Sequence, residues 1–167
     1  MRSAFFSFTL AASQILSVGL ASNVAVAADS SEPSRPDVVA APARSDRMAT
    51  ARDAIKRKEW KKSIAELTLA VREQPTNADA HNLLAYSYRK QASPDLASAF
   101  EHYNTALRLN PRHLGAHEYI GEAYLMDKKP VKAEEHLAQI KTICGNTTCE
   151  EYEDLARSIA AYKEKNR

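Results

Sequence analysis

The 167-residue sequence is poor in glycine, in cysteine and in net charge, and each shortage excludes a class of protein. With only 4 glycines, the chain has almost no material for the glycine-rich loops that cradle phosphates. Its 2 cysteines can form neither a disulfide scaffold nor a four-cysteine zinc site. The 23 Lys and Arg residues nearly balance 21 Asp and Glu, whereas a general nucleic-acid binder carries a strong basic excess. We therefore expect no nucleic-acid partner.

An uncharged, mainly apolar stretch extends from Ala4 to Ala28, behind the positive start Met1-Arg2. Its small residues at 25–27 form the A-x-A pattern that signal peptidases cleave, so we predict a signal peptide over 1–27 with cleavage near Ala27/Ala28. The alternative is a retained membrane anchor, but several Ser and Thr residues dilute the apolar stretch. We expect a periplasmic or secreted bacterial protein, with no stable membrane insertion after cleavage.

Residues 28–46 are rich in Ser and Pro and show little apolar periodicity. Such a composition cannot bury enough apolar surface to offset the entropy that is lost on ordering. We predict a flexible leader over 28–46, followed by a folded domain over 47–167.

A repeat organises the rest of the sequence. The position of Tyr88 returns at Tyr124 after 36 residues, and that of Tyr103 returns at Leu137 after 34. The period is therefore 34 residues, with two more inserted at 91–95. Further matched positions are Leu84-Ala85 with Ile120-Gly121, Ala99 with Ala133, and Ala106 with Ile140.

These residues resemble the tetratricopeptide repeat (TPR), a 34-residue helix-turn-helix unit with Leu-Gly, Tyr, Ala, an aromatic residue, Ala and Pro at set positions. The resemblance is strong in units 78–113 and 114–144. Unit 45–77 keeps Trp60, Leu67, Ala70 and Pro75 but lacks the Leu-Gly and Tyr of its first helix. The resemblance implies an all-α fold, a right-handed α-solenoid of about three TPR units. An amphipathic helix over 149–165 would cap the array, as in a group of small exported bacterial TPR proteins.

Periodicity and helix-stop signals predict seven helices, over about 47–57, 60–73, 78–91, 95–109, 114–127, 130–143 and 149–165. Ser93 before Pro94 has the pattern of a helix N-cap, and Thr148 with Glu151 has that of a capping box. We expect the small residue Gly121 to let the two helices of one unit approach closely.

Cys144 and Cys149 stand close together between the third unit and the last helix. In an exported chain, we expect such a pair to form a structural disulfide. A redox pair and a metal or free-thiol pair are the alternatives. Redox thiols of the thioredoxin type are two residues apart at a helix start, and no His lies near in sequence to complete a metal site.

The five histidines carry no catalytic motif. His81 and His117 occupy one position of successive units, and His102 and His136 occupy another, so they belong to the repeat pattern. His113 and His117 stand at i, i+4 and are the remaining candidates for a metal site, if a third ligand converges. We find no activated nucleophile, and we expect no enzyme activity and no cofactor.

In the TPR family, the first helix of each unit lines a concave groove that binds peptides, so the resemblance implies a partner-binding surface. Carried over to this sequence, the groove residues are Arg52, Lys56, Asn82, Tyr86, Arg89, Lys90, Glu118, Glu122, Leu125 and Met126. Family members that clamp a peptide carboxylate use Lys and Asn in the first unit, where this chain has Met48 and Arg52. That clamp is not reproduced.

We therefore predict a non-enzymatic periplasmic adaptor that binds a protein or peptide segment in its groove. The alternatives are a metal-handling protein that uses His113 and His117, and a homo-oligomeric structural module. If the groove binds peptide, exchange of Tyr86 and Arg89 for Ala should abolish partner capture and leave the melting curve nearly unchanged.

Overall fold

The structure, a computed structural model, describes residues 44–167. The predicted signal peptide over 1–27 and the leader up to residue 43 lie outside the described residues. Within the described range the chain is helical and has no strand: α1 (Arg44–Lys56), α2 (Trp60–Glu73), α3 (Ala78–Lys90), α4 (Leu96–Leu109), α5 (Leu114–Met126), α6 (Pro130–Cys144) and α7 (Glu150–Lys165). None of these seven helices is long and apolar enough to cross a membrane.

All seven helices fall where the sequence predicts them, and the differences lie at their ends. Helix α1 begins at Arg44, inside the predicted leader, with Asp46 in its first turn, where a carboxylate favours the helix dipole. The N-cap of α4 is Asp95 and not Ser93, because the Asp95 Oδ1 accepts a hydrogen bond from the Ser98 N–H at 3.0 Å. The predicted capping box of α7 is also wrong, since Cys149 occupies the N-cap without a side-chain bond.

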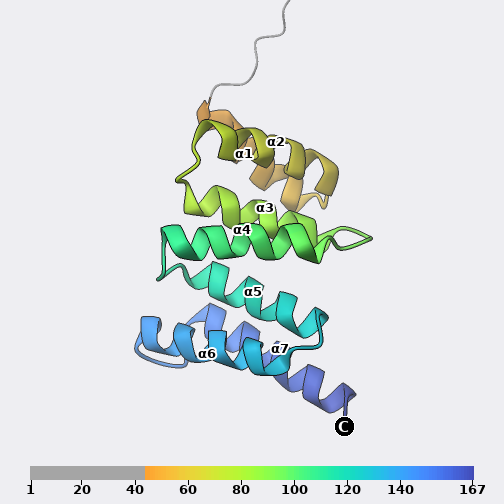
Figure 1. The fold of residues 1–167 in the computed structure, drawn as a ribbon, viewed down its shortest axis with the longest axis vertical. Coiled ribbons are helices and arrows are strands. Elements are labelled where there is room, and N and C mark those ends of the chain that lie inside the picture. The colour runs from red at the N-terminus through yellow and green to blue at the C-terminus, as the bar shows by residue number, and fades with distance from the viewer. Residues whose placement is uncertain (1–43) are drawn as a thin grey trace, which may run out of the picture. The chain divides into compact units, whose positions relative to one another are not determined.

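Six of the helices form three successive hairpins, α1/α2, α3/α4 and α5/α6, and the hairpins stack along the axis that is vertical in Figure 1. Lys58 and Lys128 take positive φ angles of 60° and 57° in the short turns of the first and third hairpins. The turn of the second hairpin spans 91–95, so the two-residue insertion that the repeat predicts lengthens this loop.

The first helices of the hairpins form one continuous face. Helix α1 contacts α3, α3 contacts α5, and α5 contacts α7, whereas α2, α4 and α6 do not contact one another. The stack is therefore closer on the side of the first helices and curves toward it. We call the surface formed by α1, α3, α5 and α7 the inner face.

The core is divided into three clusters, and each joins a hairpin to the first helix that follows it. The central residues of these clusters are Ala51, Leu67 and Leu84; then Ala85, Ala99, Tyr103, Ile120 and Ala123; and then Leu125, Ala133, Ile140, Leu155 and Ile159. No hairpin buries its apolar surface alone, as is typical of repeat proteins.

Helix α7 packs on the third hairpin in the same way as the first helix of a further unit would. Its Leu155 is fully buried against α5 and α6. A Cβ placed on Gly121 of α5 would lie 2.7 Å from Cδ2 of Leu155. Gly121 therefore permits the close approach of the capping helix, and not, as the sequence suggests, that of the two helices of its own unit.

Candidate functional site: the inner face

An aromatic row runs from the start of α2 onto the inner face. The half-buried Tyr86 of α3 meets Trp60 of α2 edge-on, with ring centroids 6.1 Å apart, and Tyr119 of α5 at 4.9 Å. The ammonium of the exposed Lys90 lies 5.8 Å from the centroid of the Tyr86 ring. Tyrosine rings offer large contact area at a low cost in side-chain entropy, so this row is suited to contact a ligand.

Arg89 lies beneath this row and is 5% exposed, although the sequence places it in the groove. Its Nη2 is 2.6 Å from Glu122 Oε2, and its Nε donates to the Tyr103 hydroxyl at 3.3 Å. Its guanidinium carbon also stands 5.4 Å and 5.7 Å from the centroids of Tyr86 and Tyr119. Arg89 thus belongs to the interior, so we now expect its exchange for Ala to lower stability, in contrast to the expectation from the sequence.

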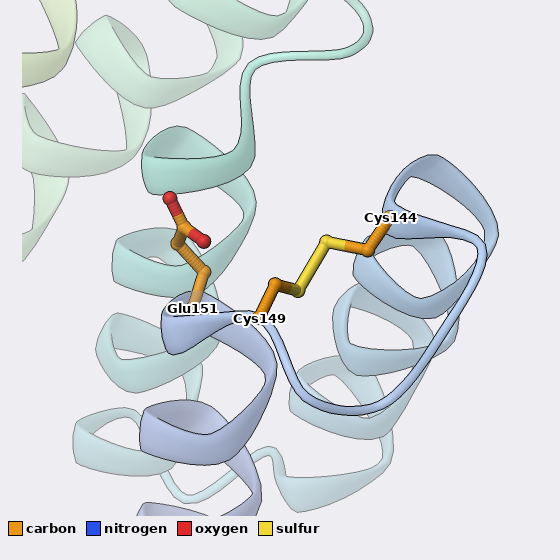
Figure 2. Close-up of side chains that lie close together, drawn as sticks. All are labelled: Cys144, Cys149 and Glu151. Atoms are coloured by element: carbon orange, nitrogen blue, oxygen red, sulfur yellow. A yellow bond between two sulfur atoms is a disulfide. The ribbon is translucent and has the colours of Figure 1, made fainter.

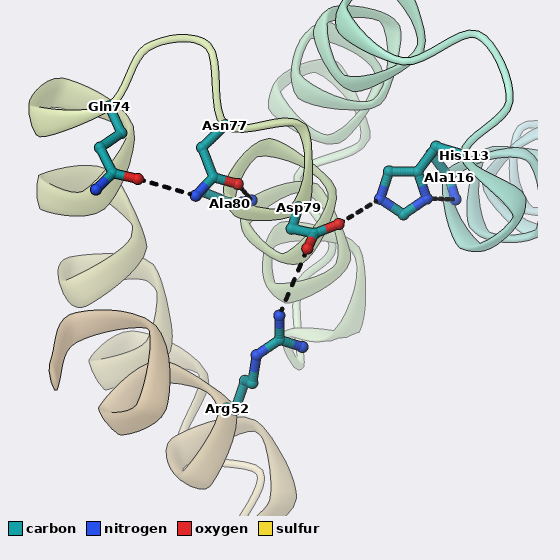
Figure 3. Close-up of polar contacts among 7 residues, drawn as sticks. All are labelled: Arg52, Gln74, Asn77, Asp79, Ala80, His113 and Ala116. Carbon is teal, nitrogen blue, oxygen red and sulfur yellow. Dashed lines mark hydrogen bonds and ion pairs between the residues drawn. The ribbon is translucent and has the colours of Figure 1, made fainter. Parts of the chain in front are cut away.

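A cavity of about 240 Å³ opens beside the row, between the starts of α3, α5 and α7. At its edge, the exposed Asp79 joins two cationic or titratable groups, as Figure 3 shows: Arg52 Nη2 lies 3.9 Å from Asp79 Oδ2, and His113 Nε2 lies 3.0 Å from Asp79 Oδ1. The other ring nitrogen of His113 accepts the Ala116 N–H at 3.3 Å and so caps α5. Asn82 and Glu151 line the same cavity.

Glu118 of α5 is 8% exposed, and its surroundings oppose its ionisation. Burial, the largest cause, and then the neighbouring carboxylates of Glu122, Asp154 and Glu151 raise its pKa to about 8. Arg89 acts in the opposite direction but is bound to Glu122. Glu118 is therefore mainly neutral at pH 7.

The other predicted groove residues have different surroundings. Leu125 is 8% exposed and lies in the third core cluster, because α7 covers it, so its assignment to the groove is wrong. Lys56 and Met126 are exposed at the last residues of α1 and α5, and Met126 is 44% exposed.

A larger depression of about 670 Å³, with Trp60 and three lysines in its wall, lies at the tips of the first two hairpins.

In every hairpin, the same two positions of the repeat, one on each helix, form a polar contact. This contact was not predicted from the sequence. In the second and third hairpins, Nδ1 of His81 faces Nδ1 of His102 at 3.1 Å, and Nδ1 of His117 faces Nδ1 of His136 at 2.9 Å. In the first, Arg47 occupies the equivalent position and forms an ion pair with Glu66 at 3.3 Å. The sequence signal was available, because both positions of the pair recur with the period.

The histidine pairs have a fixed tautomer. His81 Nε2 lies 3.1 Å from the carbonyl oxygen of Pro75, and His117 Nε2 lies 3.1 Å from that of Pro111. A carbonyl only accepts, so these Nε2 atoms carry the proton and the Nδ1 atoms accept from His102 and His136. His117 is thus committed to His136, and the structure does not bring it together with His113 as a metal site.

Protonation of these pairs is disfavoured in the fold. Burial lowers the pKa of His136 to about 4, with a smaller effect of a charge on His117. Burial is also the largest cause that lowers the pKa of His102 and of His117. A second proton on either pair would set two N–H groups against each other.

These groups predict a maximum of stability near pH 6.5. As the pH falls from 8.5 to 6.5, folded Glu118 binds a proton that the unfolded chain does not, and this contributes about 2 kcal/mol to the free energy of unfolding. Below pH 6.5 the unfolded chain protonates three histidines that the fold keeps neutral. Over this range the loss from His136 about cancels the gain from Glu118, so the lowered pKa of His102 and of His117 makes the free energy of unfolding fall toward pH 4.5.

Urea unfolding followed by circular dichroism from pH 4.5 to 8.5 measures this profile. Glu118→Gln, which resembles the protonated side chain, should remove the rise above pH 6.5 and leave the fall below it. A stability that keeps rising below pH 6.5 in the unaltered protein would contradict the assignment.

Cys144 and Cys149 form the disulfide that the sequence predicts, with Cα atoms 6.5 Å apart. Figure 2 shows that it closes the loop between α6 and α7, near the Glu151 side chain. Among residues 44–167, Cys144, Cys149 and Glu151 are the only group of three whose ligand atoms lie within 4.8 Å of one another. Both sulfurs are bonded to each other, so in this form they are not thiolate ligands.

Reduction of this disulfide should have a modest and local effect. The short loop predicts about 2 kcal/mol of chain-entropy stabilisation, and Cys149 is also the N-cap residue of α7. Hydrogen exchange of the reduced protein should therefore accelerate in α7 before it does in α3 and α4. Equal acceleration in all the helices would show that the bridge does not act locally.

Comparison with known proteins identifies the architecture. No protein-family model and no curated protein matches the sequence. Similar solved structures include the TPR2B domain of yeast Sti1 in a complex with pHsp70, with a TM-score of 0.65 and 14% identity, covering 73% of this chain and 97% of that one. The TPR domain of Arabidopsis OM64 has a TM-score of 0.63 and 14% identity, covering 72% and 96%. The first TPR domain of Spaghetti (RPAP3), bound to the HSP90 peptide SRMEEVD, has a TM-score of 0.63 and 17% identity, covering 72% and 93%.

The fold of this chain is therefore an all-α solenoid of the tetratricopeptide repeat type. The prediction from the repeat pattern is confirmed at the level of the fold, and the inner face corresponds to the first helices of the TPR units.

Proposed function

We propose that this chain is a non-enzymatic adaptor that binds a peptide or protein segment along its inner face. The observation that carries the proposal is the aromatic row beside a polar cavity: Tyr86 and Tyr119 lie on first helices of a TPR fold, and Trp60 extends the row from the start of α2. Two of the similar structures are TPR domains in complexes with pHsp70 and with an HSP90 peptide. A continuous helical face with aromatic rings beside polar groups suits an extended or helical segment.

We also propose that the adaptor acts in a bacterial periplasm after removal of residues 1–27. The uncharged stretch from Ala4 to Ala28 and the disulfide between Cys144 and Cys149 both support export to an oxidising compartment. Amino-terminal sequencing of the protein recovered from the periplasm should begin at Ala28. Recovery only from the cytosol, with Met1 still present, would contradict this location.

Partner capture tests the inner face. The tagged protein, cross-linked in cells and purified, should recover one dominant partner by mass spectrometry. Tyr86→Ala should reduce its recovery at least tenfold, because the central ring of the row is lost, whereas Tyr86→Phe keeps the ring and should capture normally.

The matched control is Val131→Ala on α6, which removes a 65% exposed side chain from a second helix. It should leave capture unchanged. Thermal melts of the four proteins show whether Tyr86→Ala remains folded at the assay temperature. Loss of the partner with Val131→Ala but not with Tyr86→Ala would place the binding surface elsewhere.

A further inference from the structure

A buried acceptor on the inner face lacks a donor. Among residues 44–167, the buried polar atoms without a hydrogen bond are Asn82 Oδ1, Arg89 Nη2 and His113 Nε2. The last two face carboxylates at 2.6 and 3.0 Å, so Asn82 Oδ1 is the one without any partner. Asn82 is 5% exposed and lines the 240 Å³ cavity together with Tyr119 and Glu151.

Glu118 is a second polar side chain that is largely buried on this face. It is 8% exposed, and no ion pair holds it among the residues that the structure describes. A buried acceptor without a donor costs roughly 1–3 kcal/mol, which a ligand recovers if it brings an N–H group. Both positions therefore favour a donor-rich ligand.

The charge around these acceptors is negative. Glu122, Asp154 and Glu151 all act on Glu118 to disfavour its carboxylate. The nearby cation, Arg89, is held by Glu122, and the Arg52 guanidinium at the far edge of the cavity faces Asp79. Asp154 is paired with the exposed Arg157 at 3.0 Å, whereas Glu151 takes part in no ion pair among residues 44–167, so a ligand that brings positive charge would meet Glu151 and Glu118.

The acidic groups around Glu118 do not form a three-ligand metal site among the residues that the structure describes. The one group of three ligand atoms within 4.8 Å among residues 44–167 contains the two disulfide sulfurs, so no three of the acidic side chains around Glu118 lie close enough to share an ion. An elongated organic cation, such as a Lys or Arg side chain, can contact these separate acidic groups one after another along its length. The rings of Tyr86 and Tyr119 already stand near the Arg89 guanidinium and would flank such a cation.

We propose that the inner face selects a partner segment that carries Lys or Arg side chains, placed across α3, α5 and α7 beside Asn82 and Glu118. This inference rests on the proposed function and specifies the chemistry of its partner. It sets this chain apart from the Spaghetti TPR domain, whose bound peptide SRMEEVD is rich in acidic residues.

Binding of such a segment is coupled to a proton. Glu118 is mainly protonated at pH 7, and a cation placed beside it favours the carboxylate. The proton of Glu118 is released to the buffer as the ion pair forms. Titration calorimetry of the complex in phosphate and in Tris at pH 7 should therefore report release of about one proton.

Selection from a phage library of random nonapeptides with the purified protein tests the charge preference. The captured peptides should be enriched in Lys and Arg relative to the input library. Glu118→Gln and Glu151→Gln should each weaken the strongest basic peptide by about tenfold, and Glu118→Gln should also abolish the proton release. The matched control Glu101→Gln removes an exposed charge from α4 and should change neither.

The outcomes separate this inference from the proposed function. Captured peptides that are enriched in Asp and Glu, or that show no charge bias, would overturn the basic preference and leave peptide binding intact. Binding and proton release that survive Glu118→Gln would overturn the role of Glu118. Failure to capture any peptide above the level of unrelated protein would overturn both proposals together.

Discussion

Leu155→Ala should lower the free energy of unfolding by about 3 kcal/mol, because it leaves a cavity where the capping helix meets the third hairpin. Leu155 is fully buried and belongs to the core cluster that also contains Leu125, Ala133 and Ile140. The effect should extend beyond α7, since this cluster is completed only by α7. Urea unfolding measures it, and Val131→Ala, at a 65% exposed position, serves as the control with little effect.

Gly121→Ala tests the same contact between α5 and α7 by a change on α5. The added methyl would lie 2.7 Å and 2.8 Å from the two methyl carbons of Leu155, so we expect a loss of about 1–2 kcal/mol despite the better helix propensity of Ala. In Gly121→Ala/Leu155→Ala the new methyl partly fills the cavity. The double variant should therefore be more stable than the sum of the single effects predicts. Simple additivity would contradict the contact.

Arg89→Ala should lower the free energy of unfolding by about 3 kcal/mol. Arg89 is 5% exposed, and its loss leaves Glu122 without its counter-ion and the Tyr103 hydroxyl without its donor. Arg89→Lys should recover only part of the loss, because an ammonium cannot reproduce the fork of a guanidinium.

The matched control is Arg72→Ala, which removes an exposed arginine from α2 and should change stability by less than about 0.5 kcal/mol. Chemical denaturation of the three variants provides the comparison. An Arg89→Ala protein that unfolds like Arg72→Ala would show that Arg89 is a surface residue, as the sequence suggested.

The fold was predictable because the same pattern of large and small residues recurs at equivalent positions of successive units. Equivalent positions such as Ala85 and Gly121, or Tyr88 and Tyr124, define the helical register and leave the insertion at 91–95 as the only change of period. Helix ends were less predictable, because a residue that matches a capping pattern can form its hydrogen bonds with other groups nearby. Thr148 matches a capping box, but its hydroxyl donates to Asn146 Oδ1 at 3.1 Å within the loop that the disulfide closes.

The site was predictable only in outline, because the family pattern places a residue on a helix face but does not fix its burial. Arg89 and Leu125 lie on first helices as predicted. Arg89, however, is buried in an ion pair with Glu122, and Leu125 is covered by α7. The pairing of His81 with His102 required two positions of different helices to be considered together. The raised pKa of Glu118 depends first on its burial and then on carboxylates of both α5 and α7, which no single helix reveals.

The most direct measurement of the central claim is photo-cross-linking in cells from single positions. A photoreactive amino acid replaces Arg52, which is exposed at the edge of the inner-face cavity, or Val131, which is exposed on the outer helix α6. If the inner face binds the partner, the Arg52 position yields one dominant cross-linked protein and the Val131 position yields none of it. Cross-linking of the same protein from Val131 alone would contradict the account.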